Sequence, residues 1–163
     1  MKKAVYAGSF DPITLGHLWM IEEGLKLTDQ LVVAIGINPE KNYLFSLEDR
    51  LEMLKACVPE DDRLSIASFD NMYLVDYARS IGADCIIRGI RSEVDYEFER
   101  VMRHINSDLD PSITTVFLMP PRDIAEVSSS VVKGLIGPEG WQAMVKQYIP
   151  EPVFQYLIAA QED

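Results

Sequence analysis

Short apolar runs that alternate with helical patterns constrain the fold of this chain more than any other feature. Helical segments lie between the runs, and a strand–helix–strand unit closes into a parallel pair through a right-handed crossover. Strands that are apolar throughout are buried on both faces. The sequence therefore predicts an α/β fold, with a doubly wound, five-stranded parallel sheet and helices on both faces. The runs, rich in Val, Ile or aromatic residues as strands are, cover residues 4–7, 31–37, 64–69, 85–87 and 114–119.

Several of the helical segments show a recognisable end. Ser46 and Asp49 have the spacing of a capping box, and Gly82 stands where a C-cap is expected. After residue 119 the pattern is helical only, so the C-terminal part is predicted to be helical. Helices are expected over residues 47–58, 74–81, 96–109, 127–136 and 141–149, and a last one has Pro150 and Pro152 in its first turn.

The size and charge of the chain limit its organisation and its partners. A length of 163 residues suits one domain, so we expect residues 1–163 to form a single one. The chain has 15 Lys and Arg against 26 Asp and Glu, which gives a net charge of −11. Nucleic acids and anionic membranes select basic surfaces, so neither is expected as a partner. An anionic ligand must therefore bind at a local basic site.

Features of the N-terminus and of the two cysteines suggest a cytoplasmic protein. The N-terminus reaches Gly8 and Asp11 before an apolar signal segment can form. No apolar run approaches the roughly 18 residues that a membrane span needs. Cys57 and Cys85 lie too far apart for a Cys-x-x-Cys motif, and both are expected to be buried thiols. We therefore expect a reducing, cytoplasmic setting.

The segment after the first strand has the outline of a phosphate site. It reads Gly-Ser-Phe-Asp-Pro-Ile-Thr-Leu-Gly-His over residues 8–17 and leads directly into a helix. In an open parallel sheet, ligands bind beyond the carboxyl ends of the strands, and a helix N-terminus attracts phosphate. Gly8 lets the backbone pass close to a ligand, while Ser9 and His17 supply donors. A strand-to-helix turn with a packing histidine is the alternative interpretation.

Three later segments bring basic or hydroxyl groups to the same edge of the sheet. Lys41 follows the second strand, where a solvent-exposed lysine is the simpler interpretation. Arg88 is the first polar residue after a buried strand, and a guanidinium there is costly unless it meets an anion. Ser128–Ser130 open a helix, where one hydroxyl caps the backbone and all three can contact an anion. Lys133, one turn further on, can reach the same phosphates.

The first of these segments carries a signature. Pro12-x-Thr14-x-Gly16-His17 resembles the T/HxGH signature of the nucleotidylyltransferase superfamily, whose fold is a Rossmann-like sheet. Neither G-x-x-x-x-G-K-[ST] nor G-x-G-x-x-G occurs in the sequence. Their absence argues against a P-loop kinase and an NAD-dependent dehydrogenase.

Four blocks extend this resemblance from residue 3 to about residue 136. They are Gly-Ser-Phe-Asp-Pro-x-Thr-x-Gly-His, then Asn-Pro-x-Lys with Phe-Ser-x-Glu-x-Arg, then Ile-Arg-Gly-Ile-Arg with Asp-Tyr-Glu-Phe-Glu at 95–99, and finally Val-Ser-Ser-Ser-x-Val-Lys. In this order they resemble the bacterial phosphopantetheine adenylyltransferases. The third block separates that family from cytidylyl, nicotinamide-mononucleotide and aminoacyl-tRNA members of the superfamily.

The resemblance implies which residues contact ATP. Ser9, Phe10 and His17 would do so, with His17 stabilising the transition state. His17 lies in the first turn of a helix, whose positive end lowers the pKa of a histidine, so we expect a neutral hydrogen-bond donor at pH 7. The nucleotide would be lined by Gly89, Ile90, Arg91, Glu99, Ile124, Ala125, Glu126, Val127, Ser128, Ser129 and Ser130.

The resemblance also implies the site of the second substrate, 4′-phosphopantetheine. Lys41 and Arg88 would hold its phosphate and, with His17, form the catalytic set. Ser9 would lie between the two substrates, and Leu74 near the pantetheine arm. The chain departs from the family twice: Ser9 stands where many members carry Thr, and loop 121–126 lacks an aromatic residue found in some relatives.

The implied reaction is attack by the phosphopantetheine phosphate on the α-phosphorus of ATP, which gives dephospho-coenzyme A and pyrophosphate without a covalent enzyme intermediate. Cationic and hydroxyl side chains suit such a reaction, because it needs alignment and charge neutralisation. Mg²⁺ is expected on the ATP phosphates, held by substrate and water. No protein metal site is expected, because Glu97 and Glu99 are two apart on a helix and point to different faces.

The expected partners beyond the substrates are copies of the chain itself and a regulator. The resemblance implies a homohexamer, built as a dimer of trimers, and coenzyme A as a candidate feedback inhibitor. Two other functions stay open: another small-molecule nucleotidylyltransferase, or a non-catalytic nucleotide-binding module. Formation of pyrophosphate from ATP with only the right acceptor would distinguish them.

Overall fold

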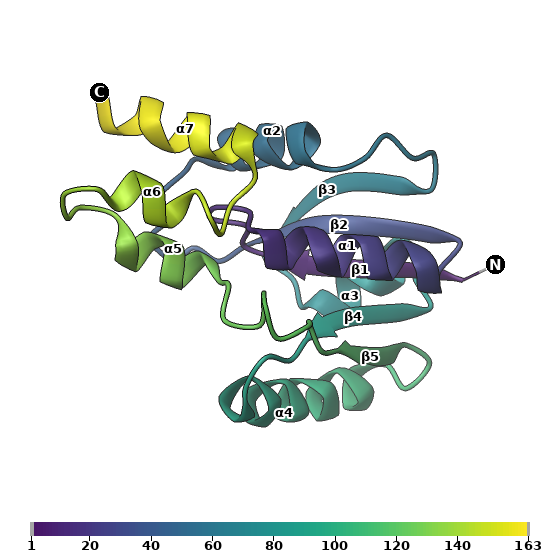
Figure 1. The fold of residues 1–163 in the computed structure, drawn as a ribbon. Coiled ribbons are helices and arrows are strands. Elements are labelled where there is room, and N and C mark those ends of the chain that lie inside the picture. Colours follow the sequence, from purple (N-terminus) through teal and green to yellow (C-terminus); the bar gives the residue numbers. More distant parts are fainter. Residues whose placement is uncertain (1, 163) are drawn as a thin grey trace.

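The computed structural model describes residues 2–162 and contains a parallel sheet with helices packed around it (Figure 1). The strands are β1 (Lys3–Gly8), β2 (Gln30–Ile37), β3 (Leu64–Asp70), β4 (Cys85–Gly89) and β5 (Thr114–Leu118). The helices are α1 (Leu15–Leu27), α2 (Leu47–Cys57), α3 (Leu74–Ser80), α4 (Glu93–Leu109), α5 (Ser129–Leu135), α6 (Trp141–Val145) and α7 (Glu151–Glu162). The strand order is β3-β2-β1-β4-β5, and every pair is parallel. The predicted doubly wound sheet with a helical C-terminus is confirmed.

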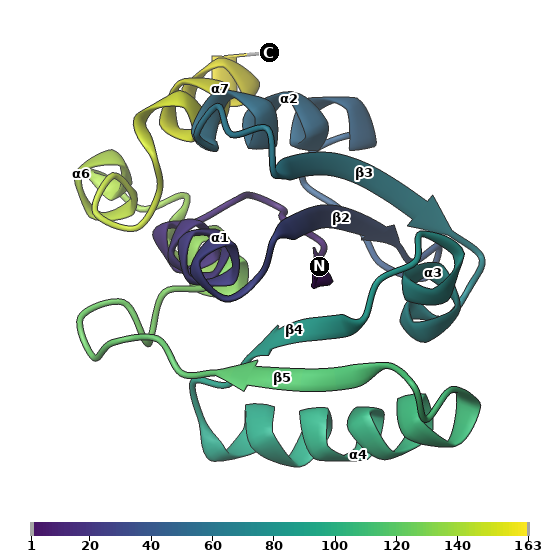
Figure 2. The same ribbon diagram turned by 90° about the vertical axis from the view of Figure 1, so that its right-hand side faces the viewer.

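The two faces of the sheet carry separate apolar cores, because successive side chains of a strand point to opposite faces. In β1, Ala4 and Tyr6 belong to the core beneath α1, α2 and α7. Val5 and Ala7 belong to the core beneath α3. Figure 2 shows α1 on one side of the sheet and α3 on the other, with α4 along β5. Helices therefore cover both faces, as the sequence predicts.

The edge strands differ from the expectation of continuous burial. The central strands β1, β2 and β4 are buried along most of their length. No residue of β3 is fully buried, and most of β5 is only half-buried. An edge strand has a neighbour on one side only, so its outer positions stay open.

Several helix ends also differ from the sequence prediction. The capping box of Ser46 and Asp49 is confirmed: the Ser46 hydroxyl accepts from Asp49 N–H, and the Asp49 side chain accepts from Ser46 N–H. α4 begins at Glu93, three residues before the predicted start, because the Ser92 hydroxyl caps it. α5 begins at Ser129 and α6 ends at Val145, so the predicted helices 127–136 and 141–149 were too long. The spacing of apolar residues alone does not show at which residue a helix is capped.

The order of the strands fixes where a site can form. β1 lies between β2 and β4, with Tyr6 opposite Val33 on one side and Ile87 on the other. From β1 the chain first adds β2 and β3 on one side of β1, and it then returns to place β4 and β5 on the other side. The boundary between β1 and β4 is therefore the switch point of the fold. The loops after β1 and β4 therefore meet at one place. No helix within residues 2–162 is long and apolar enough to cross a membrane.

Candidate active site

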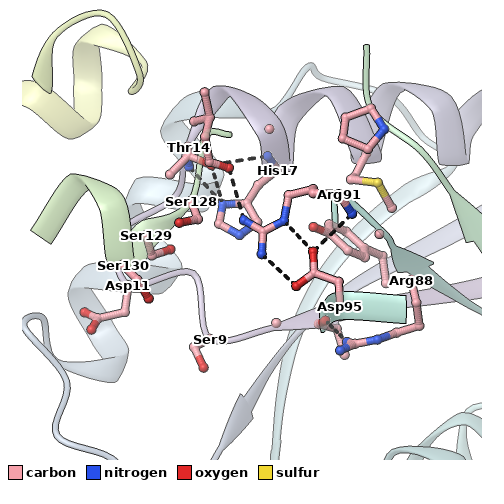
Figure 3. A pocket seen from close by; sticks show the side chains of 18 of the residues that line it. Ser9, Asp11, Thr14, His17, Arg88, Arg91, Asp95, Ser128, Ser129 and Ser130 are labelled. Atoms are coloured by element: carbon pink, nitrogen blue, oxygen red, sulfur yellow. Dashed lines mark hydrogen bonds and ion pairs between the residues drawn. The ribbon is translucent and has the colours of Figure 1, made fainter. Parts of the chain in front are cut away.

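A cavity of about 510 Å³ opens at the carboxyl ends of β1 and β4 (Figure 3). Its walls come from the β1–α1 loop and α1, the loop after β2, the start of α4 and the segment that leads into α5. α5 lies beyond the strand ends, next to α1, in Figure 1. Four basic side chains and three consecutive serines line the cavity, namely Lys41, Arg88, Arg91, Lys133, Ser128, Ser129 and Ser130.

Thr14 fixes the histidine at the start of α1. Thr14 is the N-cap, and its backbone N–H donates to Nδ1 of His17 at 2.9 Å. A backbone N–H can only donate, so Nδ1 accepts and carries no proton. The proton of the neutral ring therefore lies on Nε2. Because the hydrogen bond to Nδ1 orients the ring, this arrangement provides a fixed Nε2–H donor in a cavity-lining residue.

The environment of His17 keeps its imidazole neutral. Burial, and then the nearby charge of Arg91, lower its pKa from 6.5 to about 4. The direction agrees with the sequence prediction, although the cause is burial and Arg91 rather than the helix end alone. The Phe10 ring packs edge-on against the imidazole, with centroids 5.0 Å apart. Phe10 therefore supports His17 from the core side.

A close approach between two segments explains Gly16 beside this histidine. A Cβ at Gly16 would lie 3.2 Å from the carbonyl oxygen of Val127. In addition, the Ser129 hydroxyl donates to the carbonyl of Pro12 at 2.8 Å. The β1–α1 loop and the start of α5 are thus held together directly, although their residues lie more than 100 positions apart in sequence.

Arg88 extends from the end of β4 and is bound on two sides. Nε donates to both carboxylate oxygens of Glu99, at 2.9 and 3.0 Å, and Nη2 also donates to that carboxylate. Nη1 donates to the Ala7 carbonyl at 2.8 Å. Three of the five guanidinium N–H groups are thereby used, and two remain for a ligand. Within the protein, the anion that pairs with Arg88 is therefore the Glu99 carboxylate on α4.

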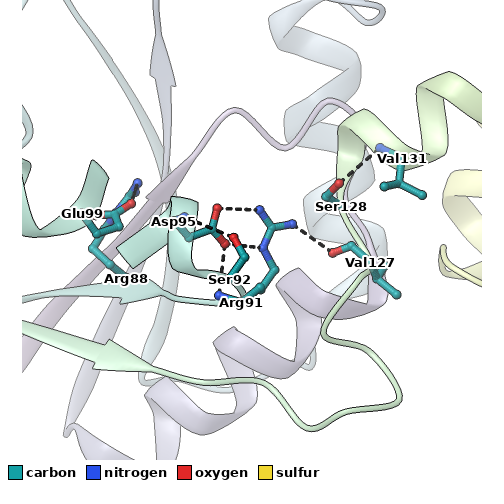
Figure 4. A network of polar contacts seen from close by, with 8 residues as sticks. All are labelled: Arg88, Arg91, Ser92, Asp95, Glu99, Val127, Ser128 and Val131. Atoms are coloured by element: carbon teal, nitrogen blue, oxygen red, sulfur yellow. Dashed lines mark hydrogen bonds and ion pairs between the residues drawn. The ribbon is translucent and has the colours of Figure 1, made fainter. Parts of the chain in front are cut away.

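Arg91 also has a carboxylate counter-ion, Asp95, which lies one turn before Glu99 on α4 (Figure 4). Its Nε donates to the Asp95 carboxylate at 2.9 Å, and the Asp95 side chain also accepts from the backbone N–H of Arg91. These contacts lower the pKa of Asp95 against the effect of its burial. Asp95 and Glu99 are four residues apart, so one face of α4 holds both arginines.

Lys133 completes the basic set from α5. Its Nζ lies 2.9 Å from the Asp11 carboxylate, which is almost completely buried. The same carboxylate accepts from the backbone N–H groups of Leu44 and Phe45 at 2.9 to 3.0 Å. Asp11 therefore joins three segments of the cavity wall.

The cavity thus pairs three of its cations with carboxylates, and Lys41 differs from them. Among the described side chains, no carboxylate lies within 4 Å of Lys41 Nζ. Nor do those side chains include a group of three His, Cys, Asp or Glu that could hold a metal ion. Lys41 is exposed on its loop, where it can turn toward an incoming anion.

Most of the predicted site residues line this cavity, and a few do not. Ser9, His17, Lys41, Arg88, Gly89, Arg91, Glu99, Ile124, Val127, Ser128, Ser129 and Ser130 lie on its wall. Phe10 and Ile90 are buried behind it. Ala125 and Glu126 lie outside the lining, while Leu74 packs at the start of α3 against the second core. Glu99, predicted to line the nucleotide, also pairs with Arg88.

Sequence reasoning missed several residues of the wall. The lining also includes Tyr6, Asp11, Thr14, Met20, Tyr43, Asp95 and Phe98. Asp11 and Thr14 belong to the recognised signature segment, so their place in the motif was a usable signal. Asp95 could be found from its i, i+4 spacing from Arg91. Tyr6 gives no such signal, because it resembles any other aromatic residue of a strand.

A cation-lined cavity at the switch point, with Thr-x-Gly-His on its wall, defines a nucleotidyltransferase. In agreement, the cytidylyltransferase-like family model matches residues 5–135. The chain is 55% identical to a phosphopantetheine adenylyltransferase of Chromobacterium violaceum, covering 98% of this chain and 97% of that protein. It is 54% identical to that of Neisseria meningitidis serogroup C, covering 97% and 93%. The chain belongs to the phosphopantetheine adenylyltransferase family.

A more distant likeness supports the fold alone. A nicotinic acid mononucleotide adenylyltransferase from Plasmodium falciparum, solved with NaAD, superposes with a TM-score of 0.68 at 16% identity. The match covers 98% of this chain and 96% of that one. The predicted Rossmann-like sheet is therefore confirmed.

Proposed function

We propose that this protein transfers the adenylyl group of ATP to 4′-phosphopantetheine, giving dephospho-coenzyme A and pyrophosphate, a step of coenzyme A biosynthesis. The observation that carries this function is the convergence of Lys41, Arg88 and the oriented His17 on one cavity in a chain of net charge −11. Family membership names the two substrates, and the cavity offers groups suited to both. The phosphate of phosphopantetheine attacks the α-phosphorus of ATP directly.

The acceptor phosphate is held by Lys41 and Arg88 in this proposal. Lys41 has no carboxylate beside it among the described side chains, and Arg88 keeps two N–H groups unused. Ser9, which follows β1 directly and lines the cavity, adds a hydroxyl donor. A phosphate monoester is already a competent nucleophile, so these groups need only align it.

His17 stabilises the charge that develops on the α-phosphoryl oxygens. Its Nε2–H donates, while Nδ1 is occupied by Thr14. A neutral ring with one fixed donor needs no reorganisation as the transition state forms. No proton has to leave the acceptor, so His17 acts without proton transfer.

The nucleotide phosphates lie toward the start of α5. Arg91, Lys133 and the serines come from that side of the cavity. Lys133 uses one N–H on Asp11 and keeps the others for phosphate. The Ser128 hydroxyl already accepts from Val131 N–H, and Ser129 donates to Pro12. The O–H groups of Ser128 and Ser130 therefore remain available to donate to ATP, whereas that of Ser129 is already used.

Mg²⁺ enters this proposal as part of the substrate. The carboxylates Asp11, Asp95 and Glu99 each face a cation, which makes them poor ligands for a resident metal ion. Oxygens of the ATP phosphates and water suit Mg²⁺ instead. The metal would neutralise charge on the triphosphate, while the side chains orient it.

Self-association is supported by an unusual surface of α4. Five large apolar residues at helical spacing are at least 40% exposed, namely Val94, Phe98, Val101, Ile105 and Leu109. A monomer rarely leaves such a stripe open to water. In a chain of net charge −11, apolar contacts also offset the repulsion between copies. We propose that this stripe contributes to a homohexamer arranged as a dimer of trimers.

Regulation by coenzyme A follows from the chemistry of the product. Coenzyme A is dephospho-coenzyme A with one further phosphate, so the same cavity would accept it. We propose that it competes with both substrates.

The function is tested by pyrophosphate release from ATP with a panel of phosphorylated acceptors. Phosphopantetheine should support turnover, while pantetheine without the phosphate, nicotinic acid mononucleotide and glycerol 3-phosphate should not. Turnover with another acceptor would identify a different nucleotidyltransferase. ATP binding without pyrophosphate release for any acceptor would indicate a non-catalytic module. Arg63→Gln, which changes an arginine outside the cavity lining, serves as the control variant.

A further inference from the structure

A buried arginine lies directly behind the wall of the cavity. Arg50, on α2, is only 2% exposed and does not line the cavity itself. Among the described side chains, no carboxylate oxygen lies within 4 Å of its guanidinium. A buried charge without a counter-ion is costly and needs an explanation.

The contacts of Arg50 lead to two of the three residues assigned to the acceptor phosphate, Ser9 and Lys41. Its Nη1 donates to the Ser9 carbonyl at 2.9 Å, and Nε donates to the Ser46 carbonyl at 3.2 Å. The first bond holds the backbone of Ser9 from behind. The second anchors the guanidinium to the start of its own helix.

The face of the guanidinium holds the loop that carries Lys41. The Tyr43 ring stacks on it, with 4.0 Å between the guanidinium carbon and the ring centroid. The Tyr43 hydroxyl accepts from the backbone N–H of Asn38 at 2.8 Å. The Asn38 carbonyl in turn accepts from the N–H of Lys41 at 3.1 Å. Arg50, Tyr43 and Asn38 therefore form a continuous chain of contacts that ends at Lys41.

We propose that Arg50 is a positioning residue that sets Ser9 and Lys41 together for the acceptor phosphate. This proposal deepens the proposed function and rests on it. The planar fork donates to two carbonyls while its face stacks on Tyr43, which an ammonium group cannot reproduce. The acceptor side of the cavity is thereby ordered before the substrate arrives.

The experiment compares Arg50→Gln and Arg50→Lys with the wild-type protein and with Arg63→Gln. Arg63 is a matched control, because it also donates to a backbone carbonyl, that of Leu25, and does not line the cavity. We expect both Arg50 variants to raise the KM for phosphopantetheine by about tenfold or more, with the KM for ATP changed by less than about twofold. Full activity of Arg50→Lys would show that charge alone suffices and would overturn the positioning role. A parallel rise of both KM values would do the same.

A double-mutant cycle tests whether Arg50 acts through Lys41. Residues that act through one another give non-additive losses. Arg50→Gln should therefore add little to the KM defect of Lys41→Ala, whereas fully additive losses would contradict the proposal. Should Arg50→Gln fail to fold, Tyr43→Leu removes the stacking contact without leaving a charge behind, and the same KM split is expected.

Binding of inorganic phosphate, followed by ³¹P NMR, separates this proposal from the proposed function. The wild-type protein and Arg63→Gln should bind phosphate equally, and Arg50→Gln about tenfold or more weakly. If the wild-type protein releases no pyrophosphate with phosphopantetheine, the proposed function fails, while this difference in binding still supports Arg50. Equal phosphate binding by the wild-type protein and Arg50→Gln overturns its role.

Discussion

Glu99 holds the Arg88 guanidinium from the side, with Nε 2.9 Å and 3.0 Å from its two carboxylate oxygens. Glu99 is 6% exposed, so the carboxylate has little contact with solvent. The pair joins the end of β4 to α4 and leaves the far side of the guanidinium to the cavity. The direction of Arg88 is therefore set by the protein before a phosphate arrives.

We predict that Glu99→Gln weakens use of phosphopantetheine more than use of ATP. The amide keeps one acceptor oxygen and places an NH₂ group against a donor, so Arg88 loses its fixed direction. A charged hydrogen bond contributes about 1.5 to 3 kcal/mol, which corresponds to an increase of roughly tenfold or more in the KM for phosphopantetheine. Steady-state kinetics with each substrate varied in turn would measure it. A selective rise in the KM for ATP would instead place Glu99 on the nucleotide.

Lys41→Ala and Arg88→Ala should both impair binding of phosphopantetheine but differ in stability. Lys41 is exposed, so its removal leaves no buried group unpaired. Arg88→Ala leaves the Glu99 carboxylate buried without a partner, which costs about 3 to 5 kcal/mol. Urea unfolding should show this difference, and Arg88→Leu with Glu99→Leu should recover much of the loss. Equal stability of the two alanine variants would contradict this account of the pair.

The acid titration of His17 should lie well below that of an ordinary histidine. Its pKa is lowered to about 4, because burial and Arg91 disfavour the charged ring. The unfolded chain, with a pKa near 6.5, binds more protons as the pH falls from about 6.5 to 4. The stability that neutral His17 contributes is thus complete above that window and is lost through it. NMR of a His104→Gln variant, which leaves a single histidine, would follow the ring directly, and a pKa near 6.5 would refute the prediction.

His17→Ala should lower turnover by about 10²- to 10³-fold, the effect of removing one oxyanion donor in other enzymes. ATP binding should change little, because the donor acts mainly in the transition state. Single-turnover kinetics and calorimetry would separate the two effects. Direct transfer from a chiral α-thiophosphate should invert configuration at phosphorus. Net retention, or a trapped adenylylated His17, would instead indicate a covalent histidine intermediate.

The exposed stripe of α4 gives a test of self-association. Phe98, the second of its five apolar residues, is 60% exposed, and Phe98→Asp should place a charge within a subunit contact. We expect a hexamer for the wild-type protein in sedimentation velocity at micromolar concentration and smaller species for the variant. A wild-type monomer under these conditions would argue against the assembly. Glu97→Asp, a conservative change at an exposed neighbour, serves as the control.

The sequence predicted the sheet and 12 of the 25 residues that line the cavity, because both depend on local patterns. Apolar runs place β1, β2 and β4, and the rule for strand ends brings Ser9, Lys41 and Arg88 to one edge. The same patterns could not predict that Glu99 turns inward to Arg88, since an exposed glutamate on a helix looks identical. They also do not show that Leu74 packs against the second core, and its place near the pantetheine arm stays a prediction.

The missed contacts share a physical cause. Asp11 and Lys133 are 122 residues apart, and Arg50 and Ser9 are 41 apart. Each pair is decided by how loops pack after the sheet has formed, and not by any local preference. Burial of Arg50 in particular runs against what composition favours for an arginine.

The bonds between the β1–α1 loop and the start of α5 have a consequence for the timing of folding. Ser129 contacts Pro12 across 117 residues of sequence, and Lys133 contacts Asp11 across 122. A growing polypeptide from which α5 is still missing therefore lacks a complete phosphate site, even when its β-strands have already paired. Nucleotide affinity should arise only after α5 has been synthesised, and products that terminate before α5 should be unable to sequester ATP. Once formed, the site joins the first turn of the protein to its last third, so bound substrate stabilises the native state as a whole.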